Sequence, residues 1–142
     1  MIASDEILQQ HGLTRREDAS AADAAGADYL GVVLSAGFGR SVVPADSKAI
    51  FAGTRAKKVA VLVDERPDRI EEVARVVAAG VIQLHGEEPP DVAAELSTRG
   101  PWRIWKTVRC GHPGQSCGGL PGGRADSGEV ACARIRRTRL TV

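Results

Sequence analysis

The sequence predicts an α/β protein in which helices alternate with parallel strands. Four short apolar runs occur before residue 110, at about residues 28–34, 59–63, 81–85 and 103–108. Each gap between two runs holds one segment with helical character, and glycine or proline marks most of the boundaries. Repetition of one strand and one helix is typical of a parallel sheet with right-handed crossovers.

Composition indicates one ordinary globular domain. The chain has 142 residues, of which 43% are hydrophobic and 26% charged. It contains no run of about 18 apolar residues, and residues 1–10 lack the basic and apolar regions of a signal peptide. The formal net charge of +1 gives no electrostatic footprint for nucleic acid. We therefore expect a cytoplasmic protein with no membrane or nucleic-acid partner.

The first helix is expected over about residues 15–25. Thr14 and Glu17 have the spacing of a capping box, in which each side chain accepts a hydrogen bond from the other residue's backbone. Gly26 follows as a typical helix stop. The run from Leu30 to Leu34 is nearly all apolar, which indicates a strand buried on both faces.

The loop after this strand carries a cation between small residues. Gly37 and Gly39 remove side chains, so the loop backbone can lie close to a ligand. The guanidinium of Arg40 presents a planar fork suited to a carboxylate or a phosphate. The alternative interpretation of Arg40 is a solvent-exposed loop cation.

Prolines open the later helices and glycines end them. The expected spans run from Pro44 to Gly53, from Pro67 to Gly80 and from Pro89 to Gly100. The middle helix has an apolar stripe at i, i+3, i+4 and i+7, formed by Ile70, Val73, Ala74 and Val77.

This pattern ends after Arg109. Residues 110–142 hold 7 of the 16 glycines and 5 arginines, without apolar periodicity. We therefore divide the chain into a βα domain over residues 1–109 and a Gly/Arg-rich tail over residues 110–142, which we expect to be irregular or disordered. The tail's Cys110, His112 and Cys117 match no common zinc spacing, so we expect no metal site.

Candidate site residues gather at the carboxyl ends of the predicted strands, where parallel βα sheets bind ligands. They are His11, Arg40, Gln83 and His85. Taken singly, Gln83 could be a buried, hydrogen-bonded amide and His85 a loop-capping histidine. Their shared edge of the sheet favours a joint site. Asp64 also ends a strand, and we interpret it as the N-cap of the next helix.

Several short segments, in order, carry a resemblance to a known family over roughly residues 11–109. They are Gly12-Leu-Thr-Arg-Arg-Glu-Asp18, Gly26-Ala-Asp-Tyr-Leu-Gly31, Gly39-Arg-Ser-Val42, Val63-Asp64, Gln83-Leu-His-Gly86 and Trp105-Lys106. Together they resemble phosphoribosylanthranilate isomerase of tryptophan biosynthesis. The resemblance implies a partial (βα)8 TIM barrel, with about the first five βα units.

The resemblance also implies an activity. The family is an intramolecular oxidoreductase, an aldose–ketose isomerase that converts an N-(5-phosphoribosyl)anthranilate aminoaldose to the aminoketose by an Amadori rearrangement. Such a reaction needs a general acid at the ring oxygen and a general base at the C2 proton. The implied partner is a phosphorylated sugar substrate, and no metal or organic cofactor is implied.

Individual roles follow from the same resemblance. The family's base is a cysteine directly before a Gly-Leu/Ile-Thr segment, and His11 stands at that position here. A histidine can act as a base near neutral pH. Arg40 matches the family's substrate-binding arginine, and Gln83 and His85 match its Gln-Leu-His-Gly segment. The family's acid is an aspartate on a sixth strand, for which Asp126 is a candidate substitute.

Two alternatives stay open. A non-catalytic partial barrel would bind a sugar phosphate or a partner chain, and open sheet edges would favour self-association. A flavodoxin-like sheet would reverse its strand order after one crossover. A barrel predicts instead that the strands adjoin in sequence order.

Overall fold

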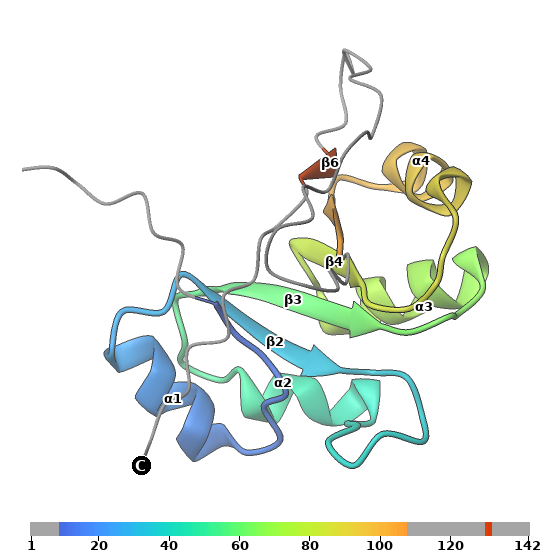
Figure 1. The fold of residues 1–142 in the computed structure, drawn as a ribbon. Coiled ribbons are helices and arrows are strands. Elements are labelled where there is room, and N and C mark those ends of the chain that lie inside the picture. The colour runs from blue at the N-terminus through green and yellow to red at the C-terminus, as the bar shows by residue number, and fades with distance from the viewer. Residues whose placement is uncertain (1–8, 108–129, 132–142) are drawn as a thin grey trace, which may run out of the picture.

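The computed structural model describes residues 9–107 and 130–131, which form one curved parallel sheet with helices against it (Figure 1). The sheet has six strands in the order β1-β2-β3-β4-β5-β6. They are β1 (Gln9–Gln10), β2 (Tyr29–Val33), β3 (Lys57–Leu62), β4 (Val81–Leu84), β5 (Arg103–Lys106) and β6 (Val130–Ala131).

Every neighbouring pair of strands is parallel, and each strand pairs with its neighbours in the chain. β3, for example, pairs with β2 and β4. This order confirms the predicted partial barrel and excludes the flavodoxin-like alternative, because a doubly wound sheet changes direction after its first crossover.

The helices lie between successive strands, close to the predicted positions. They are α1 (Arg16–Ala24), the 3-10 turn η1 (Pro44–Asp46) with α2 (Ser47–Ile50), α3 (Pro67–Val77) and α4 (Pro90–Arg99). Proline occupies the first turn of η1, α3 and α4. There the missing N–H removes no helical hydrogen bond, and the fixed φ suits the helix.

Two predicted helix boundaries are wrong. The N-cap of α1 is Arg15, with no side-chain capping bond, so Thr14 lies one residue too early to form the capping box. Glu17 instead lies 3.5 Å from Arg15 Nε, with both side chains exposed. At the end of α3, Ala78 takes the left-handed conformation (φ 55°), so the helix ends before the expected glycine, Gly80.

Two layers of apolar side chains explain the nearly continuous apolar runs. Alternate residues of a strand point to opposite faces of a sheet. The outer layer packs strand residues such as Leu30, Leu62 and Ile82 against the helices. The inner layer consists of Tyr29, Val59, Val61, Val81 and Trp105. In it, the rings of Tyr29 and Trp105 meet edge to face with centroids 4.7 Å apart.

Helices α3 and α4 are joined along their exposed sides by Arg99. This guanidinium of α4 lies 2.7 Å from Asp68 and 3.1 Å from Glu71, both on α3. The hydrogen bond and charge of Arg99 lower the pKa of Asp68. Beneath the pair, Trp102 Nε1 donates to the carbonyl of Leu96 at 2.9 Å, which satisfies a buried N–H group.

Of the tail predicted over residues 110–142, the structure describes residues 130–131. Val130–Ala131 forms β6 beside β5, and the irregular structure expected for most of the tail stays a prediction. Residues 1–8, 108–129 and 132–142 lie outside the described residues, so the domain boundary at residue 109 stays a prediction. β1 and β6 are the outer strands of the described sheet, and self-association through its edges also stays a prediction.

A comparison of neighbouring valines of α3 tests the outer layer of the core. Val77 is 2% exposed and Val76 is 43% exposed. We expect Val77→Ala to lower the free energy of unfolding by about 2 kcal/mol, through lost burial and a residual cavity. The control Val76→Ala should change it by less than about 0.5 kcal/mol. Chemical denaturation measures both, and equal losses would contradict the described helix face.

Candidate active site at the carboxyl end of the sheet

Two histidines from distant parts of the chain lie together at the carboxyl ends of the strands. His11 follows β1 and His85 follows β4, and their ring centroids are 6.3 Å apart. Gly31 of β2 makes the space for His11, because a Cβ at position 31 would lie 3.0 Å from His11 Cβ and 3.5 Å from Val59 Cβ. The imidazoles are half-buried, so both rings are within reach of a molecule bound at this end of the sheet.

Arg40 is held near His11 by a loop that folds back over the end of β2. Ser41 Oγ donates to the carbonyl of Ser35 at 2.6 Å and accepts from Phe38 N at 3.2 Å. The Arg40 side chain extends over the loop after β1, where its Cδ lies 3.5 Å from the position that a Cβ on Gly12 would take. The guanidinium therefore lies beside the residue that follows His11.

Gln83 belongs to a chain of hydrogen bonds on the inner face of the sheet. Gln9 Nε2 donates to Gln83 Oε1 at 2.7 Å, and Gln83 Nε2 donates to Thr107 Oγ1 at 2.9 Å. Thr107 Oγ1 then lies 3.3 Å from His85 Nδ1. Gln83 is thus the buried, hydrogen-bonded amide considered above, and it is also linked to His85 through Thr107.

Asp64 does not cap the following helix, which corrects the prediction. The N-cap of α3 is Arg66, two residues later. Asp64 takes a left-handed conformation (φ 51°), and its Oδ1 accepts a hydrogen bond from Glu87 N at 2.7 Å. This contact needs a glycine at position 86, because a Cβ there would lie 2.4 Å from Asp64 Oδ1.

A buried carboxylate, Glu88, links the loops after β3 and β4 to the end of β5. It accepts hydrogen bonds from Asp64 N at 2.9 Å and Gly86 N at 3.0 Å, and it pairs with Lys106 at the end of β5. Burial alone would raise the pKa of Glu88. The hydrogen bond from Lys106 and those from backbone N–H groups outweigh burial, and the pKa is lowered. Glu88 therefore stays charged near neutral pH.

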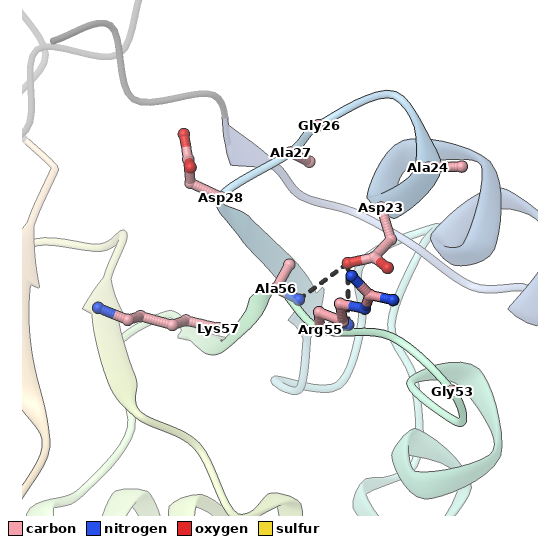
Figure 2. A pocket seen from close by; sticks show the side chains of 9 residues that line it. All are labelled: Asp23, Ala24, Gly26, Ala27, Asp28, Gly53, Arg55, Ala56 and Lys57. Carbon is pink, nitrogen blue, oxygen red and sulfur yellow. Dashed lines mark hydrogen bonds between the residues drawn. The ribbon is translucent and has the colours of Figure 1, made fainter.

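A separate hollow lies at the opposite end of β2 and β3 (Figure 2). There Asp23 Oδ1 accepts hydrogen bonds from Arg55 N at 3.0 Å and Ala56 N at 2.8 Å. The carboxylate thus holds the loop that enters β3. Parallel sheets carry their sites at the other end, so we assign this hollow a structural role.

The remaining sequence candidates can be placed only in part. Across residues 9–107 and 130–131, no group of three or more His, Cys, Asp or Glu side chains could hold a metal ion. Cys110, His112, Cys117 and Asp126 lie outside the described residues. Within the described ranges, no helix has the length and apolar character needed to cross a membrane.

The structure brings His11 and His85 together, links Gln83 to His85, and places Arg40 over Gly12. Gln9 and Thr107 were missed as members of this constellation. Strand alternation could have indicated them, because Gln9 precedes His11 by two residues and Thr107 follows the inner-face Trp105 by two residues.

Parallel strands in sequence order, with imidazoles and a cation at their carboxyl ends, define this chain as part of a (βα)8 barrel. The model of the family "N-(5'phosphoribosyl)anthranilate (PRA) isomerase" matches residues 8–115. The chain therefore belongs to the phosphoribosylanthranilate isomerase family.

Individual relatives agree with this assignment. The chain is 41% identical over 104 residues to the N-(5'-phosphoribosyl)anthranilate isomerase of Solibacter usitatus, covering 72% of this chain and 49% of that protein. It is 44% identical over 93 residues to the enzyme of Chromohalobacter salexigens, covering 64% of this chain and 42% of that protein. The chain thus spans about half the length of the curated relatives it matches.

Solved structures show the same partial coverage. Phosphoribosyl anthranilate isomerase from Thermus thermophilus superposes with a TM-score of 0.71 at 31% identity, covering 78% of this chain and 55% of that one. A second structure superposes with a TM-score of 0.67 at 32% identity, covering 72% and 53%. That protein is in complex with reduced 1-(o-carboxyphenylamino)-1-deoxyribulose 5-phosphate.

The contact between Asp64 and Gly86 predicts a specific coupling. Gly86→Ala should lower the free energy of unfolding by about 1–3 kcal/mol, because the methyl group overlaps the Asp64 carboxylate. In an Asp64→Gly background the same substitution should cost much less. Gly39→Ala, where the added Cβ has no neighbour within 4 Å, is the control. Additive effects in this double-mutant cycle would contradict the contact.

The lowered pKa of Glu88 predicts a pH-dependent contribution to stability. Because the folded-state pKa of Glu88 is lowered below its unfolded value, the contribution is present above the unfolded pKa and is lost as pH falls through the folded pKa. Glu88→Gln should cost about 1–3 kcal/mol at neutral pH, and this difference should shrink in acid. Glu87→Gln, at the exposed neighbouring residue, is the control. A Glu88→Gln loss that is constant with pH would exclude a charged Glu88.

Proposed function

We propose that this chain carries the isomerase chemistry of its family, the Amadori rearrangement of an N-(5'-phosphoribosyl)anthranilate aminoaldose to the aminoketose in tryptophan biosynthesis. The observation that carries the proposal is the family match over residues 8–115, which includes His11, Arg40, Gln83 and His85. The proposed substrate is a phosphorylated sugar, and the proposed compartment is the cytoplasm.

The roles follow from the chemistry of the side chains. His11 acts as the general base that removes the C2 proton, since a neutral imidazole accepts a proton near physiological pH. Arg40 binds a carboxylate or phosphate group of the substrate through its planar guanidinium. The ligand named in the solved relative carries both kinds of anion, which supports an anion-binding role for Arg40. His85 contacts the sugar, and the buried Gln83 contributes to substrate binding through its link to His85 by way of Thr107.

A binding-only function is the second candidate. The observation that favours it is the residue at position 11, because the family's base is a cysteine and His11 has a larger ring with its basic nitrogen placed differently. In this case the partial barrel holds a sugar phosphate or a partner chain without turning substrate over. Arg40 has the same anion-binding role in both candidates.

Turnover of N-(5'-phosphoribosyl)anthranilate by the purified chain tests the proposal. We expect His11→Ala to lower kcat/KM by a factor of about 10² to 10⁴, the typical contribution of a positioned acid or base. We expect His11→Cys to retain more activity than His11→Ala, because a thiolate can also accept the proton. Thr98→Val, on the exposed side of α4, is the control.

The other outcomes separate the candidates. Turnover that is unchanged in His11→Ala would remove His11 as the base. Absence of turnover, together with calorimetric binding of an aminoketose phosphate that Arg40→Ala weakens, would support the binding-only function. Absence of both would contradict the isomerase activity and the binding of a sugar phosphate.

A further inference from the structure

We infer that Thr107 is a positioning residue that fixes the tautomer of His85, with the proton on Nε2, and that the buried pair Gln9–Gln83 sets the direction of the Thr107 hydroxyl. The inference about the tautomer stands on the hydrogen bonds alone. Its consequence for the substrate rests on the proposed function.

The series of hydrogen bonds that leads to His85 starts at Gln9. Its Nε2 donates to Gln83 Oε1 at 2.7 Å, which turns the carbonyl oxygen of Gln83 toward β1. The amide nitrogen of Gln83 therefore faces the other way and donates to Thr107 Oγ1 at 2.9 Å. Gln83 is 1% exposed. In such a buried position each polar atom needs a protein partner, so the two hydrogen bonds hold the amide in one orientation.

The hydroxyl of Thr107 then determines which nitrogen of the His85 imidazole accepts a hydrogen bond. A hydroxyl that accepts a hydrogen bond from an amide N–H still has its own proton to donate. The nearest ring nitrogen is His85 Nδ1, at 3.3 Å. To accept that proton, Nδ1 must carry a lone pair, so the proton of the neutral ring resides on Nε2.

The opposite direction is a defined alternative. It would require Gln83 Nε2 to donate to Gln9, Thr107 to donate to Gln83 Oε1, and His85 Nδ1–H to donate to Thr107. Every atom would again be satisfied, but the proton of His85 would reside on Nδ1. The two directions differ in whether residue 9 donates or accepts, and in the structure Gln9 donates. A side chain at position 9 that only accepts hydrogen bonds would therefore impose the opposite tautomer.

This assignment divides the roles of the two histidines. A neutral imidazole that donates from Nε2 can polarise a carbonyl or a ring oxygen without carrying a full positive charge. His85 is then a hydrogen-bond donor to the sugar, while His11, with its ring centroid 6.3 Å away, is the group that accepts the C2 proton. Thr107 acts on the reaction through His85.

Nitrogen-15 NMR of the labelled 142-residue chain tests the tautomer directly. At alkaline pH, where the ring is neutral, the protonated and unprotonated nitrogens have well-separated shifts. The loss of signals in His85→Asn assigns the ring. We expect the proton on Nε2 in the unmodified chain. A proton on Nδ1 would overturn the inference.

Gln9→Glu provides the decisive variant, with Gln10→Glu as its matched control. A carboxylate at position 9 only accepts hydrogen bonds, so the Gln83 amide must turn, Thr107 must donate to it, and the His85 proton must move to Nδ1. Gln10 is on the opposite face of β1, so Gln10→Glu should leave the tautomer unchanged. An unchanged His85 spectrum in Gln9→Glu would overturn the inference.

Two double variants show whether Thr107 transmits the effect. Adding Thr107→Val to Gln9→Glu removes the hydroxyl and should cancel the shift of the proton to Nδ1, whereas adding Thr107→Ser keeps a hydroxyl and should preserve it. If Thr107→Val leaves the Gln9→Glu effect intact, the assigned role of Thr107 is wrong.

Activity measurements separate this inference from the proposed function. If the chain turns over the aminoaldose, Gln9→Glu should lower kcat by at least about tenfold, as expected for loss of a donor at a developing charge, and Gln10→Glu should not. If no variant shows turnover while the tautomer responds as described, the proposed function fails and the positioning role stands. If the chain turns over the substrate but the tautomer does not respond, the proposed function stands and the positioning role of Thr107 fails.

Discussion

The carboxyl end of the sheet depends on one buried charge, the carboxylate of Glu88. It receives backbone N–H groups from the loops after β3 and β4 and the ammonium group of Lys106 from the end of β5. Few groups other than a carboxylate could accept all of these donors at once. Glu88 thereby holds these three segments together, and His85 lies three residues before it in the loop after β4.

Much of the fold could be predicted from the sequence, because its signals are local. Apolar runs and proline or glycine boundaries placed β2 to β5 and the helices between them, and the structure confirms their sequence order. Helix ends were less predictable. Thr14 and Asp64 have side chains suited to capping, but the N-caps of α1 and α3 are Arg15 and Arg66, one and two residues later. A cap depends on backbone angles that a residue type does not determine.

The candidate site was predictable as a set of single residues but not as a network. His11, Arg40, Gln83 and His85 were found from their positions after strands and from the family resemblance. Their connections were not, since Gln9 and Gln83 are far apart in the chain and meet only because β1 and β4 line the same inner face. Asp64 shows the same limit, because its partner Glu87 lies in a loop that approaches only after β3 and β4 have paired.

The sequence-ordered sheet also has a consequence for how the chain can be made. Each strand pairs with the next strand along the chain, so each of these pairings closes a loop that spans one βα unit. During synthesis, β2 and β3 can pair before β4 has left the ribosome, and each later βα unit adds to an edge that already exists. Because the sheet grows in one direction, the hydrogen bonds from Gln9 through Gln83 to Thr107 are completed late. The last of them forms when Thr107, which follows β5, reaches Gln83.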